Sequence, residues 1–464
     1  MGKVLVLGID GAPPEYFFHS WLNELPNIRK LINKGCYAEL NSTIPNLSIV
    51  AWTSIITGKP PADTSIFEYI YRENYSYNDI RIVTSRNIKA KTAWEIASEK
   101  WKKPIVCFVV GMWPVRPFDG LLIAGPNIPN REDVEFTHPK NLKEEIERVL
   151  GKKLIVDIPS VKDFRNMSKE KLIEEAYYVT KMHFDTIKYL IKNKEWDLFW
   201  GFIGQSDRLN HMFWRYMDPL HRRYDSKSEF KDTLKNYYKF FDQGLGEVLE
   251  LLDRDTKLIV LSDHGITRMH NRINLTDWLI KNNYMVLKEP IKSRTEFKPE
   301  MVDWKKTKVF AIGAYESQIF INLKGREPEG CVEKEDYYSL LKELKEKLKN
   351  IPGDDGLILD TKFFMKKDYF KGRYQDIAPD MVVYFDNLHY GCNNSLIGNE
   401  TLYGLETAKG GDDACHSWKG IFIMDNHKSK GYLGEIDNLD VTPTILKMLD
   451  VDIPKDLKGK VIGN

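Results

Sequence analysis

Short apolar runs rich in β-branched residues alternate along this chain with segments of helical periodicity. The apolar runs are Val4–Ile9, Ile105–Val110, Leu198–Ile203, Leu258–Leu261, Met381–Tyr384 and Gly420–Met424. The clearest helical segments are Glu170–Asn193, Glu229–Leu252, Lys334–Lys349 and Val441–Leu449. Strands that are apolar on both faces are typical of a parallel sheet covered by helices on both sides. We therefore expect an α/β protein with a central, mostly parallel sheet between helices.

The stretch from about 290 to 410 differs from its surroundings. It is rich in Lys, Glu and turn residues, its strand signals are shorter, and the pattern of the core resumes near Gly420. We expect a catalytic core that is discontinuous in sequence, formed by residues 1–290 and 411–464. Residues 291–410 are then an inserted, smaller subdomain.

The composition excludes several classes of protein. Lys and Arg number 68 against 67 Asp and Glu, so there is no overall field favouring nucleic acid or an acidic membrane. The five cysteines are scattered without a CxxC pair, as in a protein with reduced thiols. The longest apolar stretch, around Pro104–Val115, is too short to span a bilayer, and the N-terminal run stops at Asp10. We expect a cytoplasmic protein without a nucleic-acid or membrane partner, its oligomeric state undetermined.

Carboxylates follow three of the expected strands where each strand ends, and histidines accompany them. The residues are Asp10, Asp207 with His211 four positions later, Asp263 with His264, and His416 shortly before the run at Gly420. Ligands of open α/β sheets bind at the carboxyl edge of the strands. Parallel strands end at one edge, so we expect these side chains to converge there.

Three converging aspartates would repel one another unless a cation held them together. The histidines beside them indicate a pair of divalent metal ions. Mixed imidazole and carboxylate ligands suit zinc, with manganese or iron as alternatives, rather than calcium. A single aspartate after a strand is more often a helix cap or a turn residue, but four such clusters at strand ends are hard to explain in that way.

A nucleophile candidate lies in the segment between Ser42 and Gly58. A helix is expected to start just after Ser48 and to end near Gly58. A hydroxyl at a helix N-terminus lies close to free N–H groups and to the positive end of the helix dipole, which favour an alkoxide and an anionic substrate. The alternative is that Ser48 is an ordinary N-cap.

Together these segments resemble the type I phosphodiesterases/nucleotide pyrophosphatases of the alkaline phosphatase superfamily, in particular its prokaryotic branch. The matching strings are Leu7–Gly11, Pro45–Pro60, Ser206–Pro219, Ser262–Gly265, Ile273–Leu275, Phe320–Arg326, Ala378–Asp380 and Asp440–Thr444. No single string is specific, but the combination is. The resemblance implies an alkaline-phosphatase-like core and the roles of the site residues. One metal ion would be held by Asp207, His211 and His416, and the other by Asp10, Asp263, His264 and the oxygen of Ser48.

The resemblance also implies which residue is the nucleophile. In the family it stands nine residues before the threonine of a Thr-Gly pair, and counting back from Thr57 gives Ser48. The string Thr43-Ile-Pro45 resembles the nucleophile string of nucleotide pyrophosphatases but lies fourteen residues back. Five extra helical residues would move the hydroxyl by about 7 Å at 1.5 Å per residue. Ser48 is therefore preferred over Thr43.

Two departures from the family leave the substrate-binding residues unassigned. Thr64-Ser65 stands where the family usually has His-Gly, and Phe67-Glu68-Tyr69 where many members have an asparagine that helps hold a phosphate oxygen. Tyr69 offers a hydrogen-bond donor in that region, but it is interpreted as a packing residue.

The function implied is metal-dependent hydrolysis of a small phosphodiester or pyrophosphate, with a nucleotide among the candidate substrates. The alternatives are a phosphomonoesterase of the same superfamily and a metal-binding protein without activity. His270 lies near the Asp-His pair, but nothing in the sequence requires it as a ligand.

Overall fold

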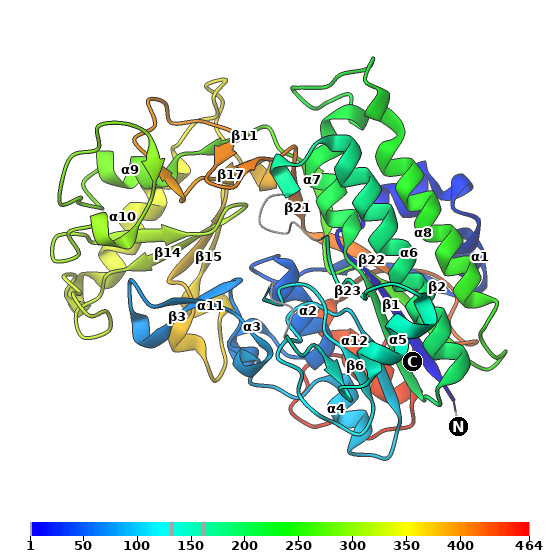
Figure 1. Cartoon of the computed structure of the whole chain (residues 1–464). Coiled ribbons are helices and arrows are strands. Elements are labelled where there is room, and N and C mark those ends of the chain that lie inside the picture. The colour runs from blue at the N-terminus through cyan, green and yellow to red at the C-terminus, as the bar shows by residue number, and fades with distance from the viewer. Residues whose placement is uncertain (1, 130–133, 159–163, 464) are drawn as a thin grey trace.

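The computed structural model describes residues 2–129, 134–158 and 164–463. A nine-stranded sheet forms the centre of the larger part, with the strand order β23-β2-β22-β9-β1-β8-β5-β6-β7 (Figure 1). Its strands are β1 (Val4–Ile9), β2 (Cys36–Asn41), β5 (Pro104–Cys107), β6 (Leu121–Ile123), β7 (Thr137–His138), β8 (Leu198–Ile203), β9 (Lys257–Leu261), β22 (Lys419–Asp425) and β23 (Gly431–Asp437). The consecutive strands from β9 to β6 are all parallel.

Helices cover both faces of this sheet, as two glycines on adjacent strands show. A Cβ on Gly8 of β1 would point at Trp52 of α2 (Ser48–Thr57), whereas a Cβ on Gly201 of β8 would point at Ile187 of α6 (Lys169–Asn193). The other helices of this part are α1 (Pro26–Lys34), α3 (Pro61–Thr64), α4 (Ala93–Ser98), α5 (Leu142–Leu150), α7 (Gln205–Met217), α8 (Thr233–Leu249) and α12 (Val441–Met448). The α/β architecture with a mostly parallel central sheet between helices is therefore confirmed.

One expected core strand runs in the opposite direction to its neighbour. β22 pairs antiparallel with β9, with Phe422 opposite Leu261. Its beginning, rather than its end, therefore lies at the edge where β9 ends. A short antiparallel ribbon of β10 (Gly265–Arg268) and β21 (Ala414–Ser417) lies beyond that edge and holds the segment that leads into β22.

A separate antiparallel sheet lies beside the core, on the left in Figure 1. Its order is β13-β14-β16-β15, from Val309–Ile312, Ser317–Ile321, Met381–Tyr384 and Lys362–Met365 respectively. The run Met381–Tyr384, expected in the central sheet, thus belongs to this second sheet. Its apolar residues pack on a second hydrophobic cluster with α9 (Leu275–Lys281) and α10 (Tyr337–Lys349). That cluster begins at Ile273 and also receives Tyr77, and the division of the chain at 290 and 410 stays a prediction.

Short strand pairs complete the structure. A parallel pair joins β11 (Asn271–Ile273) to β17 (Tyr390–Cys392), and its apolar residues belong to the second hydrophobic cluster. The remaining strands and α-helix of the described residues are β3 (Ile70–Arg72) with β4 (Ile80–Ile82), β12 (Thr295–Glu296) with β18 (Leu396–Ile397), β19 (Glu406–Thr407) with β20 (Gly410–Gly411), and α11 (Lys366–Tyr369). In the described ranges, no helix combines the length and the apolar character that crossing a bilayer requires.

Candidate active site

The structure brings all seven residues singled out from the sequence to one edge of the central sheet. They come from the end of β1 (Asp10), the first residue of α2 (Ser48), the first two turns of α7 (Asp207 and His211), the segment between β9 and β10 (Asp263 and His264), and β21 (His416). All but Asp207 are buried, and the Asp207 side chain is 14% exposed. Parallel β1, β8 and β9 supply the acids from one direction, and the antiparallel entry into β22 supplies His416 from the other.

One half of the site surrounds Ser48. The Ser48 hydroxyl donates to Asp10 Oδ1 at 3.2 Å and also lies 3.2 Å from His264 Nε2. The same His264 nitrogen lies 3.2 Å from Asp263 Oδ2 and 3.5 Å from Asp10 Oδ1. The donor atoms of Asp10, Asp263 and His264 all fall within 4.8 Å of one another, which suits a single metal ion.

The other half is built around Asp207. Its Oδ1 lies 3.3 Å from His211 Nε2 and 3.6 Å from His416 Nε2, and these two nitrogens are 3.3 Å apart. Asp207, His264 and His416 form a second group of donors within 4.8 Å. The His264 imidazole is therefore shared between the two halves, whereas the sequence analysis places it in one.

Backbone carbonyls hold the three imidazoles in one tautomer. Nδ1 of His211 lies 3.0 Å from the Ala414 carbonyl, and Nδ1 of His416 lies 2.8 Å from the Asn46 carbonyl. Nδ1 of His264 is 3.0 Å from the carbonyl of Gly265. Because a carbonyl only accepts, each Nδ1 carries the proton and donates, which leaves the Nε2 lone pair facing the centre. This carbonyl-fixed arrangement is typical of metal-ligating histidines.

The electrostatics of the carboxylates favour a cation. Burial raises the pKa of Asp10 well above its ordinary value, and the neighbouring Asp263 and Asp207 raise it further. Burial likewise raises the pKa of Asp263. Burial opposes ionisation of Asp207 too, but its attraction to His211, and then to His416 and His264, outweighs burial and lowers its pKa. These three acids at one edge are therefore kept ionised together only by compensating positive charge.

Two features test whether the site suits divalent ions. Oδ1 of Asp207 and Oδ2 of Asp263 are buried and have no hydrogen-bond donor in the structure. Zinc ligands at about 2.0–2.2 Å in a tetrahedron are roughly 3.4 Å from one another, and the neighbouring donor atoms here are 3.2–3.6 Å apart. Orphaned carboxylate oxygens at ligand spacing, with imidazole lone pairs beside them, fit zinc or a similar divalent ion.

The two nucleophile candidates lie in different surroundings. Ser48 is the first residue of α2, not its N-cap, since the cap position is Leu47. Thr43 is also buried, but its hydroxyl donates to the Pro45 carbonyl at 2.5 Å, away from the acids and histidines. Only the Ser48 hydroxyl of the two contacts the site residues.

Two tyrosines near the site are not assigned a role from the sequence. Tyr69 packs against the main hydrophobic cluster, as expected, and burial and then the nearby Asp10 raise its pKa, so that it also lies close to the site. Tyr315 stacks on His211 with 4.9 Å between ring centroids, and its hydroxyl lies 3.2 Å from His211 Nε2. Tyr315 also accepts from Arg165 at 2.9 Å. These contacts arise between segments far apart in the chain, and only the position of Tyr69 near the nucleophile could have suggested one of them.

Two arginines approach the site, and each pairs with a carboxylate. Arg208, on α7 next to Asp207, pairs with the buried carboxylate of Asp157. Arg165 Nε donates to Asp412 Oδ1 at 2.7 Å, but Asp412 also pairs with the buried Arg272. Arg208 therefore has a carboxylate of its own, whereas Arg165 shares one.

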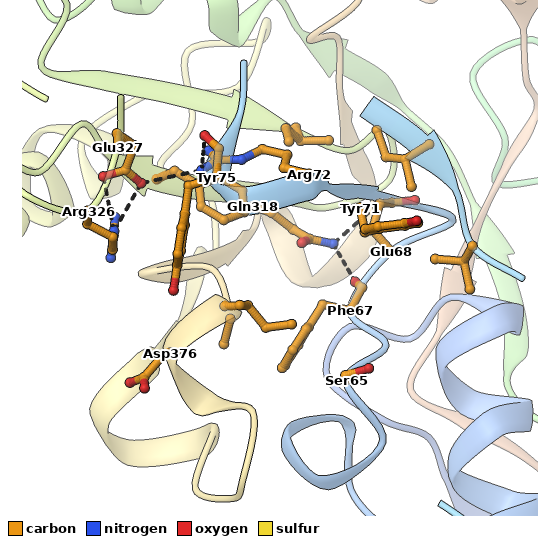
Figure 2. Close-up of a pocket in the computed structure, with 16 residues that line it drawn as sticks. Ser65, Phe67, Glu68, Tyr71, Arg72, Tyr75, Gln318, Arg326, Glu327 and Asp376 are labelled. Carbon is orange, nitrogen blue, oxygen red and sulfur yellow. Dashed lines mark hydrogen bonds and ion pairs between the residues drawn. The ribbon is translucent and has the colours of Figure 1, made fainter. Parts of the chain in front are cut away.

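A cavity of about 90 Å³ is lined by side chains from residues 65–83, 312–327 and 376–378 (Figure 2). At one end the Gln318 amide bridges acids, donating to Glu68 Oε2 at 3.2 Å and to Glu316 Oε1 at 3.1 Å. Burial and then the neighbouring Glu316 raise the pKa of Glu68 to about 8. The other end holds Arg72, which pairs with Glu327 at 3.4 Å.

Comparisons with known proteins agree with this geometry. The sequence profile of the type I phosphodiesterase/nucleotide pyrophosphatase family matches residues 4–402. No match was found among curated proteins. Among solved structures, the chain is similar to murine ectonucleotide pyrophosphatase/phosphodiesterase 5, an inactive form in complex with AMP, with 12% identity, a TM-score of 0.56, and coverage of 98% of this chain and 96% of that one.

Two further structures show the same fold. Human ectonucleotide pyrophosphatase/phosphodiesterase 5 has 13% identity and a TM-score of 0.53, over 97% of this chain and 96% of that one. Phosphonoacetate hydrolase from Sinorhizobium meliloti 1021, in complex with phosphonoformate, has 14% identity and a TM-score of 0.60 over the same shares. At these identities the similarity concerns the fold alone.

Proposed function

Because the chain belongs to the type I phosphodiesterase/nucleotide pyrophosphatase family, and is thus a phosphoric ester hydrolase, we propose that it cleaves small phosphodiesters or pyrophosphates with Ser48 as nucleophile and two divalent metal ions. One observation carries the proposal: the Ser48 hydroxyl lies 3.2 Å from both Asp10 Oδ1 and His264 Nε2, at the N-terminus of α2. A hydroxyl among metal-ligand side chains and at the positive end of a helix is placed to attack an anionic phosphate.

The residues that would hold the ions are those of the two halves of the site. Asp10, Asp263, His264 and Ser48 would hold one, and Asp207, His211 and His416 the other, with zinc favoured by the donor set. When bound, such ions lower the pKa of a coordinated hydroxyl and neutralise the oxygens of a transferring phosphoryl group.

The side chains of the site have distinct roles in the proposed reaction. The Ser48 oxygen forms a bond to phosphorus while the ester or anhydride bond opposite breaks and the leaving group departs. Asp10, which accepts the Ser48 hydrogen bond, is placed to receive the proton. Water then attacks the phosphorus of the seryl intermediate, which still carries the second ester group. The bond between the Ser48 oxygen and phosphorus breaks, a phosphate monoester is released, and Ser48 regains its proton. Tyr69, which lies close to Ser48 and Asp10, is suited to orient the nucleophile.

The pairing of Arg208 supports diesters over monoesters. A monoester presents one more charged oxygen than a diester, and an arginine is the usual partner for it. Arg208, next to Asp207, is already paired with Asp157. Arg165 shares Asp412 with the buried Arg272, so this argument for diesters rests on Arg208 alone.

The test compares kcat/KM for bis-p-nitrophenyl phosphate with that for p-nitrophenyl phosphate at one pH and one zinc concentration. We expect the diester to be preferred, and a nucleotide anhydride and a phosphonate extend the panel because the similar structures hold AMP and phosphonoformate. Preference for the monoester would contradict the diester assignment. Absence of all hydrolysis by zinc-loaded protein would contradict the proposal as a whole.

A further inference from the structure

A second cluster of metal-binding side chains lies outside the active site. It consists of His270, Asp386 and His389, whose donor atoms all lie within 4.8 Å of one another. None of the three belongs to the active-site groups, and the sequence gives no reason to connect them. They are partly exposed, so an ion could enter from solvent.

Strand pairing places the two histidines side by side. β11 and β17 are parallel and in register from Asn271 opposite Tyr390. His270 and His389 immediately precede these residues, and the backbone N–H of His270 donates to the His389 carbonyl at 2.7 Å. Residues in register in a parallel pair project to the same side. The two rings accordingly lie with centroids 5.1 Å apart.

The carboxylate is brought to the histidines by an unusual turn. Asp386, Asn387 and Leu388 all have left-handed backbone angles, with φ of 47°, 48° and 80°. Leucine rarely adopts this conformation, so the turn is held by its surroundings, including the Trp418 indole, which donates to Asn387 at 2.8 Å. The result is that Asp386 Oδ2 lies 3.6 Å from His389 Nδ1.

One donor of the cluster lacks a partner. Nδ1 of His270 is buried and makes no hydrogen bond in the structure. A buried polar atom without a partner costs free energy unless a ligand satisfies it. Here the unsatisfied atom is an imidazole nitrogen of His270, and His270 is one of the three clustered residues that could bind a metal ion.

The charged neighbours do not oppose a cation. Arg222 and Arg268 lie near the imidazoles. Arg268 is paired with Asp218 at 2.7 Å, and Arg222 with Asp354. With both arginines compensated, the Asp386 carboxylate remains the group whose charge attracts an ion.

We propose that His270, Asp386 and His389 bind a further divalent transition-metal ion, which cross-links the corner between β10 and β11 to the turn between β16 and β17. Two imidazoles and one carboxylate are a zinc donor set that leaves a fourth position for water. Ligand atoms around zinc are roughly 3.4 Å apart, so the cluster contracts slightly on binding, which partly exposed rings permit. The ion ties the turn that leaves the second sheet to the β10–β21 ribbon that carries His416.

The test counts ions in the full-length protein. Wild type is stripped with a chelator, reloaded with zinc, dialysed, and analysed for metal by mass spectrometry. We expect the double variant His270→Asn/His389→Asn to hold one zinc ion fewer per chain than wild type, with kcat/KM for the diester unchanged. The matched control is His427→Asn, because His427 Nδ1 also faces a carboxylate, Asp425 Oδ1 at 3.3 Å, but belongs to no donor group among the described residues.

The test compares the zinc content of wild type with that of the double variant, and only the difference of one ion matters. The test is therefore valid whether or not the active site binds zinc or hydrolyses a diester. A milder variant, Asp386→Asn, guards against misfolding and is expected to raise the zinc Kd of this site by at least about tenfold. Equal zinc in wild type and the double variant, or equal loss in His427→Asn, would overturn the proposal.

Discussion

The imidazole rings of His264 and His416 stack with their centroids 3.7 Å apart and their planes 16° apart. His264 follows β9 and His416 precedes β22, which runs antiparallel to β9. The stack therefore lies where the parallel part of the sheet, which ends with β9, adjoins the antiparallel strand β22. It also joins the two halves of the candidate site, since His264 belongs to both groups of donor atoms.

Replacing Ser48 tests the nucleophile. Ser48→Ala removes the attacking atom, so we expect hydrolysis to fall by several orders of magnitude while the zinc content of the remaining ligands persists. The matched control is Thr43→Ala, which loses only the hydrogen bond to Pro45 and about 1 kcal/mol of stability. The measurements are the rate of diester hydrolysis and the metal content of both variants. A larger loss of hydrolysis in Thr43→Ala than in Ser48→Ala would show Thr43 to be the nucleophile.

Replacing Asp263 tests the electrostatic role of the metal ligands. Asp263→Asn removes a buried negative charge at nearly constant shape and keeps an oxygen that can accept from the Gly11 N–H. We expect weaker zinc binding and lower activity. In chelator the variant should unfold at the same or a higher denaturant concentration than wild type, because repulsion with Asp10 is relieved. A variant with full zinc affinity and activity would exclude Asp263 as a ligand.

Releasing Arg208 should change substrate preference. Asp157→Asn removes the carboxylate that neutralises Arg208, whose charge lies near Asp207 and Asp10. We expect the ratio of monoester to diester kcat/KM to rise several-fold, because the freed guanidinium can meet the extra phosphate charge. The double variant Asp157→Asn/Arg208→Met is the control and should not show the rise. An unchanged ratio in Asp157→Asn would mean that Arg208 does not reach the substrate.

Glu68 should make stability fall as the pH rises. Its pKa of about 8 in the fold exceeds the value of about 4.3 in an unfolded chain. Between these pH values the folded protein keeps a proton that the unfolded chain has lost, so the free energy of unfolding decreases as pH increases through this window. Glu68→Gln removes the effect.

The pH dependence of stability due to Glu68 is measured by denaturant unfolding of wild type and Glu68→Gln at about pH 6 and about pH 9. The control is Glu335→Gln, because Glu335 is exposed. We expect the stability of Glu68→Gln relative to wild type to be greater at the higher pH. A constant difference would show that Glu68 ionises normally.

Gly8 in β1 sets the distance between the sheet and α2, the helix that begins with the proposed nucleophile Ser48. A Cβ there would lie 2.5 Å from Cη2 of Trp52, which is fully buried in α2. We expect Gly8→Ala to lose about 1–3 kcal/mol of stability through overpacking and to reduce kcat by displacing Ser48. Gly411→Ala is the control, since its nearest neighbour would be 3.9 Å away. Thermal unfolding and diester kinetics are measured for both variants. Wild-type stability and kcat in Gly8→Ala would show that Trp52 can move to make room for the added methyl group.

The apolar runs that precede Asp10, Asp207 and Asp263 by themselves determine much of this protein. A strand that is buried on both faces has few alternatives to a parallel sheet under helices, and its chain direction decides which end carries the acid. The sequence therefore sufficed for the fold class, the edge that carries the candidate site and the family. The sequence did not indicate that His264 is shared between the two halves of the site, because this depends on which loops come together in the folded chain.

Tertiary structure alone decided whatever depended on pairing between distant segments. It placed Met381–Tyr384 in the second sheet, turned β22 antiparallel and thereby brought His416 to the site, and set His270 beside His389. It also directed Arg208 onto Asp157. Local patterns record how a segment buries its own side chains, whereas the partner of a strand edge or a buried charge is chosen among all segments of the folded chain.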